Sequence, residues 1–171
     1  MRSFIQFINS VTEWSGRVLC FLLYPGFLLL AYEVFMRYFV EAPSVWTLGI
    51  SQRLFAIYYL MAGAYALLYN SHIRMDIIFA RFSARTKSIV DLIFTYPLLF
   101  GVCFVLIWHG SQYAWTSILQ KELDNTAFMA PVWPIKIFIP LGGIFLFLQG
   151  VSKFYPALVT AITGKVLEEK K

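Results

Sequence analysis

Four long runs of apolar residues constrain the fold of this chain more than any other feature. They cover residues 18–40, 48–69, 88–117 and 134–159. A helix needs about 20 residues to cross a hydrocarbon layer about 30 Å thick, and each run is at least that long. Backbone groups inside a bilayer must satisfy their own hydrogen bonds, so we expect α-helices here. The sequence therefore predicts an all-α membrane protein with four transmembrane helices.

The composition agrees with burial in a membrane. Of the 171 residues, 60% are hydrophobic and 13% are charged, whereas a soluble domain carries about 25% charged residues. Cys20 and Cys103 both lie inside apolar runs, so we expect small buried side chains rather than a disulfide or a metal site. The length fits a single membrane domain, and the net charge of +5 does not indicate a nucleic-acid partner.

The segments outside the four runs complete the predicted domain. In residues 1–16, apolar side chains recur at helical spacing between polar ones, which predicts an amphipathic lead-in at the membrane surface. The first run is then expected to remain as an uncleaved anchor. Residues 160–171 form a predicted cytoplasmic tail. The third run is long for a bilayer, so it should tilt, protrude or kink near Pro97.

The distribution of basic residues predicts the orientation. With four crossings, both termini and the segment 70–87 lie on one side, which then carries ten of the fourteen Lys and Arg residues. The other side carries Arg37, Arg53, Lys121 and Lys136. Because basic loops stay in the cytoplasm, both termini are predicted to be cytoplasmic.

The connection at residues 70–87 concentrates positive charge. On a helix, Arg74, Arg81 and Arg85 would share one face, with Lys87 close behind. Another face would be apolar, formed by Met75, Ile78, Phe79 and Phe82. The pattern predicts a basic amphipathic arm on the cytoplasmic surface, with its cations toward anionic lipid headgroups. The alternative is a positively charged loop without regular structure.

Three ionisable residues near the outer ends of the first two runs form a second cluster. Glu33 and Arg37 are one turn apart, and Arg53 reaches a similar depth on the second run. Charges within a bilayer cost about 2.5–3.5 kcal/mol each on insertion scales, so they are expected to pair. We interpret the three as a network that packs the helices together. A substrate or ion site, or snorkelling to the headgroups, are the alternatives.

No catalytic pattern is present. The sequence has no phosphate-binding glycine loop, no HExxH, no GxSxG and no CxxC. His72 and His109 would lie about 30 Å apart along the helices, too far to hold one haem. From the residues alone we expect no enzyme activity and no cofactor, but an accessory or scaffold subunit. A membrane anchor for a redox complex and an independent small transporter remain as alternatives.

A series of short patterns gives a more specific prediction. Arg37 ends the first run, Trp46 precedes the second, Gly63 and Ala64 lie within it, and residues 72–76 read His-Ile-Arg-Met-Asp. His72 and Asp76 would either pair across one helical turn or be solvated. A proline-rich start, APVWPIKIF, opens the fourth run. In this order the patterns resemble the small membrane subunit of TRAP (tripartite ATP-independent periplasmic) transporters, the DctQ-like small permeases. One departure is that the family often has acidic residues after the tryptophan, and here residues 47–52 contain none.

The resemblance implies a three-part system in the inner membrane of a bacterium or archaeon. A periplasmic binding protein would capture a small organic acid, a carboxylate or a sulfonate. A large membrane subunit of about twelve spans would carry it inward, coupled to sodium. The small subunit would be a scaffold that binds the large one. Its outer basic residues would meet an acidic patch on the binding protein, and these are Arg37, Arg53, Lys121 and Lys136.

Overall fold

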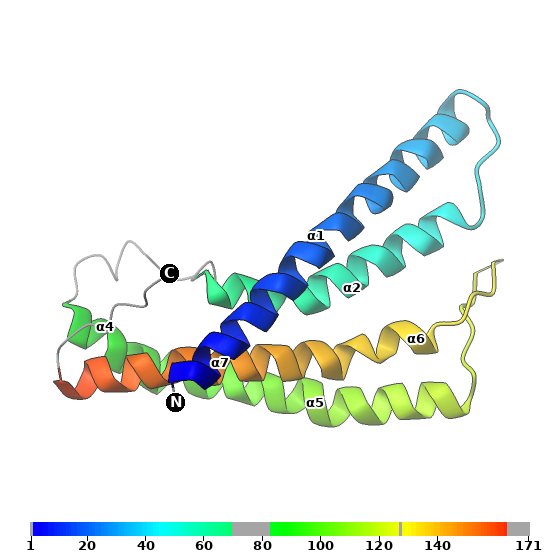
Figure 1. The fold of residues 1–171 in the computed structure, drawn as a ribbon. Coiled ribbons are helices and arrows are strands. Elements are labelled where there is room, and N and C mark those ends of the chain that lie inside the picture. Colours follow the sequence, from blue (N-terminus) through cyan, green and yellow to red (C-terminus); the bar gives the residue numbers. More distant parts are fainter. Residues whose placement is uncertain (1, 70–82, 127, 164–171) are drawn as a thin grey trace.

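A computed structural model describes residues 2–69, 83–126 and 128–163, and these ranges are helical apart from short connections (Figure 1). The elements are α1 (Arg2–Tyr38), α2 (Thr47–Leu68), α4 (Ala84–Val90), the π-helical turn η1 (Asp91–Thr95), α5 (Tyr96–Leu119), α6 (Trp133–Lys136) and α7 (Phe138–Thr163). Within these ranges the only β-type pairing is an isolated bridge between Leu123 and Pro131. The predicted all-α fold is confirmed.

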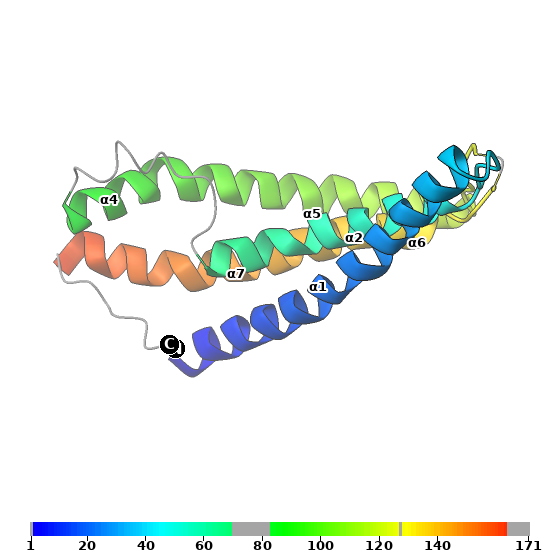
Figure 2. The same ribbon diagram turned by 90° about the horizontal axis from the view of Figure 1, so that it is seen from above.

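The four long helices alternate in direction and form two hairpins. One is made by α1 and α2, the other by α5 and α7, and α2 packs on α7 to join them (Figures 1 and 2). The beginning of α1 also reaches α7. The connections at residues 39–46 and 120–132 lie at the same end of the molecule, which we call the connection end (Figure 1).

Among the described residues, three helical segments are long and apolar enough to cross a membrane. They are Ile5–Tyr38, Arg85–Leu119 and Trp133–Thr163. Helix α2 is not one of them, because the polar series Ser51, Gln52 and Arg53 and several tyrosines lower its mean hydropathy. The membrane crossing of α2, like the orientation of the chain, therefore stays a prediction.

Two helix boundaries differ from those expected from the sequence. From Arg2 onward, the predicted lead-in and the first apolar run form one continuous helix, α1, with no break between them. The third helical path begins at Ala84, inside the predicted arm, and continues through η1 into α5. The π-helical turn ends two residues before Pro97, whose ring would clash with the carbonyl of Ile93, four residues earlier, in a regular α-helix. The remainder of the arm, residues 70–82, lies outside the described residues.

The burial pattern is the reverse of that in a soluble protein. Large apolar side chains such as Trp14, Phe21 and Leu98 are about 70% exposed. Polar side chains fill much of the interior, including Thr12, Glu33, Thr47, Ser51, Gln149 and Ser152. Such an exterior suits a lipid environment or a membrane partner, and polar contacts are a usual means of joining helices there.

The cysteine prediction is correct for one residue and wrong for the other. Cys103 is completely buried, whereas Cys20 is exposed. Apolar composition predicted that both lie in a spanning helix but not toward which side each points. Both thiols are free.

Candidate functional site

Glu33 joins α1 to the start of α2. It is buried on α1 near the connection end, and its Oε1 accepts a hydrogen bond from Arg37 Nη2 at 2.8 Å. Its other oxygen accepts from the backbone N–H of Ser44 at 3.2 Å and from the Ser44 hydroxyl. The Ser44 hydroxyl in turn contacts that of Thr47, the first residue of α2. The carboxylate thus lies near a helix N-terminus, where negative charge is favourable.

The structure places Arg53 elsewhere, so its predicted membership of the Glu33 network is corrected. Its Nη2 donates to Asp124 Oδ2 at 3.2 Å and to the carbonyl of Ala130 at 3.4 Å. Arg53 therefore ties α2 to the connection between α5 and α6. Counting residues placed Arg53 near the start of the second helix, but it could not give the direction in which the side chain points. Its Nε and Nη1 are buried without a hydrogen-bond partner.

Lys136, the last residue of α6, stabilises the connection between α5 and α6. Its side chain is buried and forms an ion pair with Glu122, while its Nζ lies 3.8 Å from the centre of the Tyr113 ring. The hydrogen bond from Lys136 lowers the pKa of Glu122 below its ordinary value. Two backbone hydrogen bonds close the connection, from Asp124 N to Ala130 O and from Val132 N to Glu122 O.

Both connections contain residues in the left-handed backbone region. Glu41, Lys121 and Met129 have φ values of 55°, 46° and 46°. Lys121 follows α5, where it donates to Ile118 O while Glu122 donates to Ser117 O, both at 3.1 Å. This is the Schellman arrangement, in which glycine is the usual residue at this position. The connection end is therefore held in a defined and locally strained shape.

Only two of the four basic residues predicted to dock the binding protein present exposed side chains. Arg37 and Lys121 are exposed, whereas the side chains of Arg53 and Lys136 are 17% and 8% exposed and ion-paired. Trp46 precedes α2, and its ring lies 6.2 Å from that of Tyr32.

At the end of the molecule opposite the connection end, Arg85 contacts helix α7. Its Nε donates to the carbonyl of Ala161 near the end of α7 at 3.0 Å. Lys87 is half-buried in α4. The other residues predicted for the arm and its motif lie outside the described residues, namely Arg74, Arg81, His72 and Asp76.

A polar network between α1 and α7 was not anticipated from the sequence. Gln149 is fully buried, accepts from the Thr12 hydroxyl at 2.9 Å and donates to Asn9 Oδ1 at 3.1 Å. Ser152 donates to the same oxygen at 3.0 Å. Amide and hydroxyl residues inside apolar runs were the available signal, because such residues often join membrane helices.

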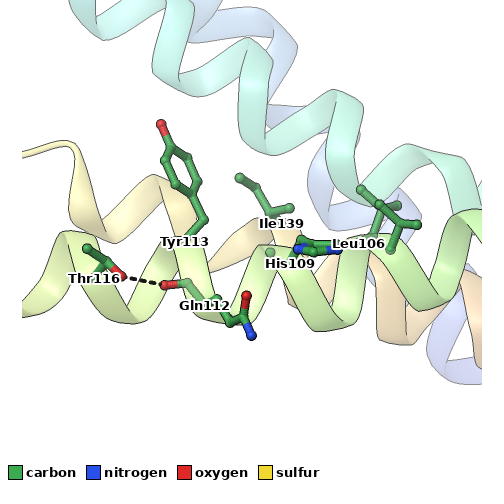
Figure 3. Close-up of a pocket in the computed structure, with 8 residues that line it drawn as sticks. Leu106, His109, Gln112, Tyr113, Thr116 and Ile139 are labelled. Carbon is green, nitrogen blue, oxygen red and sulfur yellow. Dashed lines mark hydrogen bonds between the residues drawn. The ribbon is translucent and has the colours of Figure 1, made fainter.

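A shallow groove of about 560 Å³ lies on α5 and the start of α7 (Figure 3). Its lining is mixed, with four polar side chains that we call the α5 polar face: His109, Gln112, Tyr113 and Thr116. Across the part of the chain that the structure covers, no three His, Cys, Asp or Glu residues are grouped to hold a metal ion. The geometry therefore offers binding surfaces and ties between helices rather than catalytic chemistry.

Long apolar helices joined by buried polar contacts define an all-α membrane protein of several spans. The sequence profile of the DctQ component of the tripartite ATP-independent periplasmic transporters matches residues 26–160, so the chain belongs to that family. It is a small membrane component of such a transporter, as its short patterns predicted. The family works with a large membrane subunit and a periplasmic binding protein. No curated protein matches the chain.

Proposed function

We propose that this chain is the fixed scaffold of its transporter. It binds and stabilises the large subunit during sodium-coupled, binding-protein-dependent uptake of a small organic acid, a carboxylate or a sulfonate. It carries no cofactor of its own, and sodium coupling belongs to the large subunit. The observation that supports this role most directly is that buried polar side chains form hydrogen bonds between different helices and connections.

These ties act at several levels of the molecule. Glu33 joins α1 to the start of α2, and Gln149 joins α1 to α7. Arg53 joins α2 to the connection before α6. Elements that move during function usually have few buried contacts and low local stability. Helices linked in this way are suited to stay in place while a partner moves.

In this proposal the chain crosses the inner membrane four times with both termini in the cytoplasm. The connection end then faces the periplasm, where Arg37 and Lys121 are available to the binding protein. The basic residues of 70–87 contact anionic lipids on the other side. Labelling of single cysteines from either side of the membrane tests this orientation. Periplasmic labelling at position 170 would reverse it.

The scaffold role is tested by purifying tagged protein from its native membrane in mild detergent. The expected result is a stoichiometric, very hydrophobic partner, together with uptake in vesicles that needs all three components. As a control, uptake is measured with each of the three components left out in turn. A chain that purifies alone and transports alone contradicts the scaffold role. A Soret band in the purified sample would instead indicate a redox anchor.

A further inference from the structure

Helix α5 lies at the edge of the helical arrangement and packs mainly against α7 (Figures 1 and 2). Away from that contact it carries the α5 polar face. These residues are spaced by three, one and three positions, so they fall on one side of the helix. All four are exposed and line the groove.

Two side chains on this face have unused hydrogen-bonding groups. Thr116 donates to the backbone carbonyl of Gln112 at 2.9 Å, so its hydroxyl is satisfied within the helix (Figure 3). Within the described ranges, the imidazole of His109 and the side-chain amide of Gln112 make no hydrogen bond. The amide points away from α6 and α7 in Figure 3.

The depth of these groups makes their exposure costly. His109 lies ten residues before the end of α5 at Leu119, which is about 15 Å along the helix axis. This helix is one of the segments long and apolar enough to cross a membrane. Hydrocarbon offers no hydrogen-bond partner for an imidazole or an amide. A neighbour with polar groups would supply what lipid tails cannot.

The groove chemistry favours a protein neighbour over a lipid headgroup. A phosphate would need a cation in the groove, but no Lys or Arg lines it, and the ammonium of Lys136 next to the Tyr113 ring is paired with Glu122. Aromatic rings beside the polar face, including Trp108 and Trp115, are more than half exposed and offer apolar contact area. A polar row within an apolar surface matches another transmembrane helix, since interhelical hydrogen bonds are made in this way.

We propose that the α5 polar face is the site at which a transmembrane helix of the large subunit docks. A hydrogen-bonding side chain of that helix reaches His109 and Gln112, and the neighbouring aromatic rings pack against its apolar side. This inference rests on the proposed binding of a large subunit and adds the face through which it binds.

The test compares His109→Leu/Gln112→Leu with Phe104→Leu, a change of an exposed residue on the same helix that does not line the groove. Each tagged variant is co-expressed with the large subunit and purified from membranes. The double variant is expected to retain about fivefold less large subunit, the size expected for two lost interhelical hydrogen bonds. Phe104→Leu should retain as much large subunit as the unaltered chain. Full retention by the double variant would overturn the proposal, because leucines are harmless on a lipid-facing surface.

A second measurement applies even if the double variant accumulates poorly. A photoreactive phenylalanine analogue at position 112 is expected to crosslink to the large subunit in native membranes. Crosslinks to lipid alone, with position 104 reaching the large subunit, would overturn the assignment of this face. If the unaltered chain brings down no large subunit at all, the proposed scaffold function itself fails, which is a separate result.

Discussion

The Arg53 guanidinium is only partly hydrogen-bonded, and the residue one helical turn earlier is a glycine. Residues 47–52 contain no acidic side chain, and Gly49 lies one turn before Arg53. A Cβ placed at Gly49 would lie 2.9 Å from Arg53 Nη1. That nitrogen and Nε are buried without an acceptor, while Nη2 reaches across to Asp124. An acid at position 49 would therefore supply an acceptor that the present sequence lacks.

Gly49→Asp is expected to stabilise the protein by about 1 kcal/mol. The aspartate would pair with Arg53 one turn later and lie in the first turn of α2, and the helix would also lose a flexible glycine. The close atom is the far end of a flexible side chain, so it can shift to make room. Thermal unfolding in detergent measures the gain, with Gly49→Ala reporting the effect of helix propensity alone. An aspartate variant less stable than the alanine variant would contradict the pairing.

Lys121 offers a second test at a single backbone position. Its φ of 46° is costly for any residue with a Cβ, and glycine avoids that cost. Lys121→Gly should therefore raise the free energy of unfolding by about 1 kcal/mol. Lys121→Ala removes the same charge but keeps the Cβ, so it should show no such gain. Equal stability of the two variants would mean that the charge, not the backbone, governs this position.

Some helices pack so closely at glycine residues that a larger side chain would not fit between them. On α7, a Cβ at Gly142 would lie 2.5 Å from the backbone oxygen of Leu60 in α2. Gly142→Ala is therefore expected to lower the free energy of unfolding by about 2 kcal/mol, because a backbone atom cannot move aside. Gly101 on α5 has nothing within 4 Å, so Gly101→Ala is the matched control and should be neutral or stabilising by up to about 1 kcal/mol, the helix-propensity gain of alanine over glycine. A similar loss in both variants would indicate a general effect of alanine in these helices.

The connection between α5 and α6 is expected to respond to acid through Glu122. The hydrogen bond from Lys136 lowers the pKa of Glu122 from its ordinary value of 4.5. The ionised form is therefore favoured in the folded state, and its contribution is complete above 4.5 and lost as the pH falls through the lowered value. Unfolding midpoints measured between neutral pH and about pH 3 should fall more steeply for the unaltered protein than for Glu122→Gln. Parallel curves would show that the pair contributes nothing.

Some features of this molecule could be predicted from sequence and others could not, for a consistent reason. Apolar runs predicted the helices, and charge spacing predicted the contact between Glu33 and Arg37, because both depend on neighbours along the chain. Position along the chain also placed Arg53 near the start of α2. It did not give the direction of Arg53 or the partner of Gln149, since both depend on how the helices are rotated against one another.

At the scale of the whole transporter, the two exposed basic side chains at the connection end allow a test of how the binding protein docks. Arg37, which pairs with Glu33, and Lys121 have exposed side chains, whereas Arg53 and Lys136 are largely buried in their ion pairs. Arg37→Gln/Lys121→Gln should slow association of the binding protein about tenfold at low salt, because steering depends on surface charge. The difference should shrink as salt is added.

Association rates measured on the complete transporter in nanodiscs decide this prediction. Lys170→Gln, in the predicted cytoplasmic tail, removes a charge from the other side and should leave the rate unchanged. Equal slowing by Lys170→Gln would point to net charge rather than to a docking surface. An unchanged rate in the double variant would mean that docking rests on the large subunit. Arg53 and Lys136 provide the contrast, since their replacement should reduce stability before it affects docking.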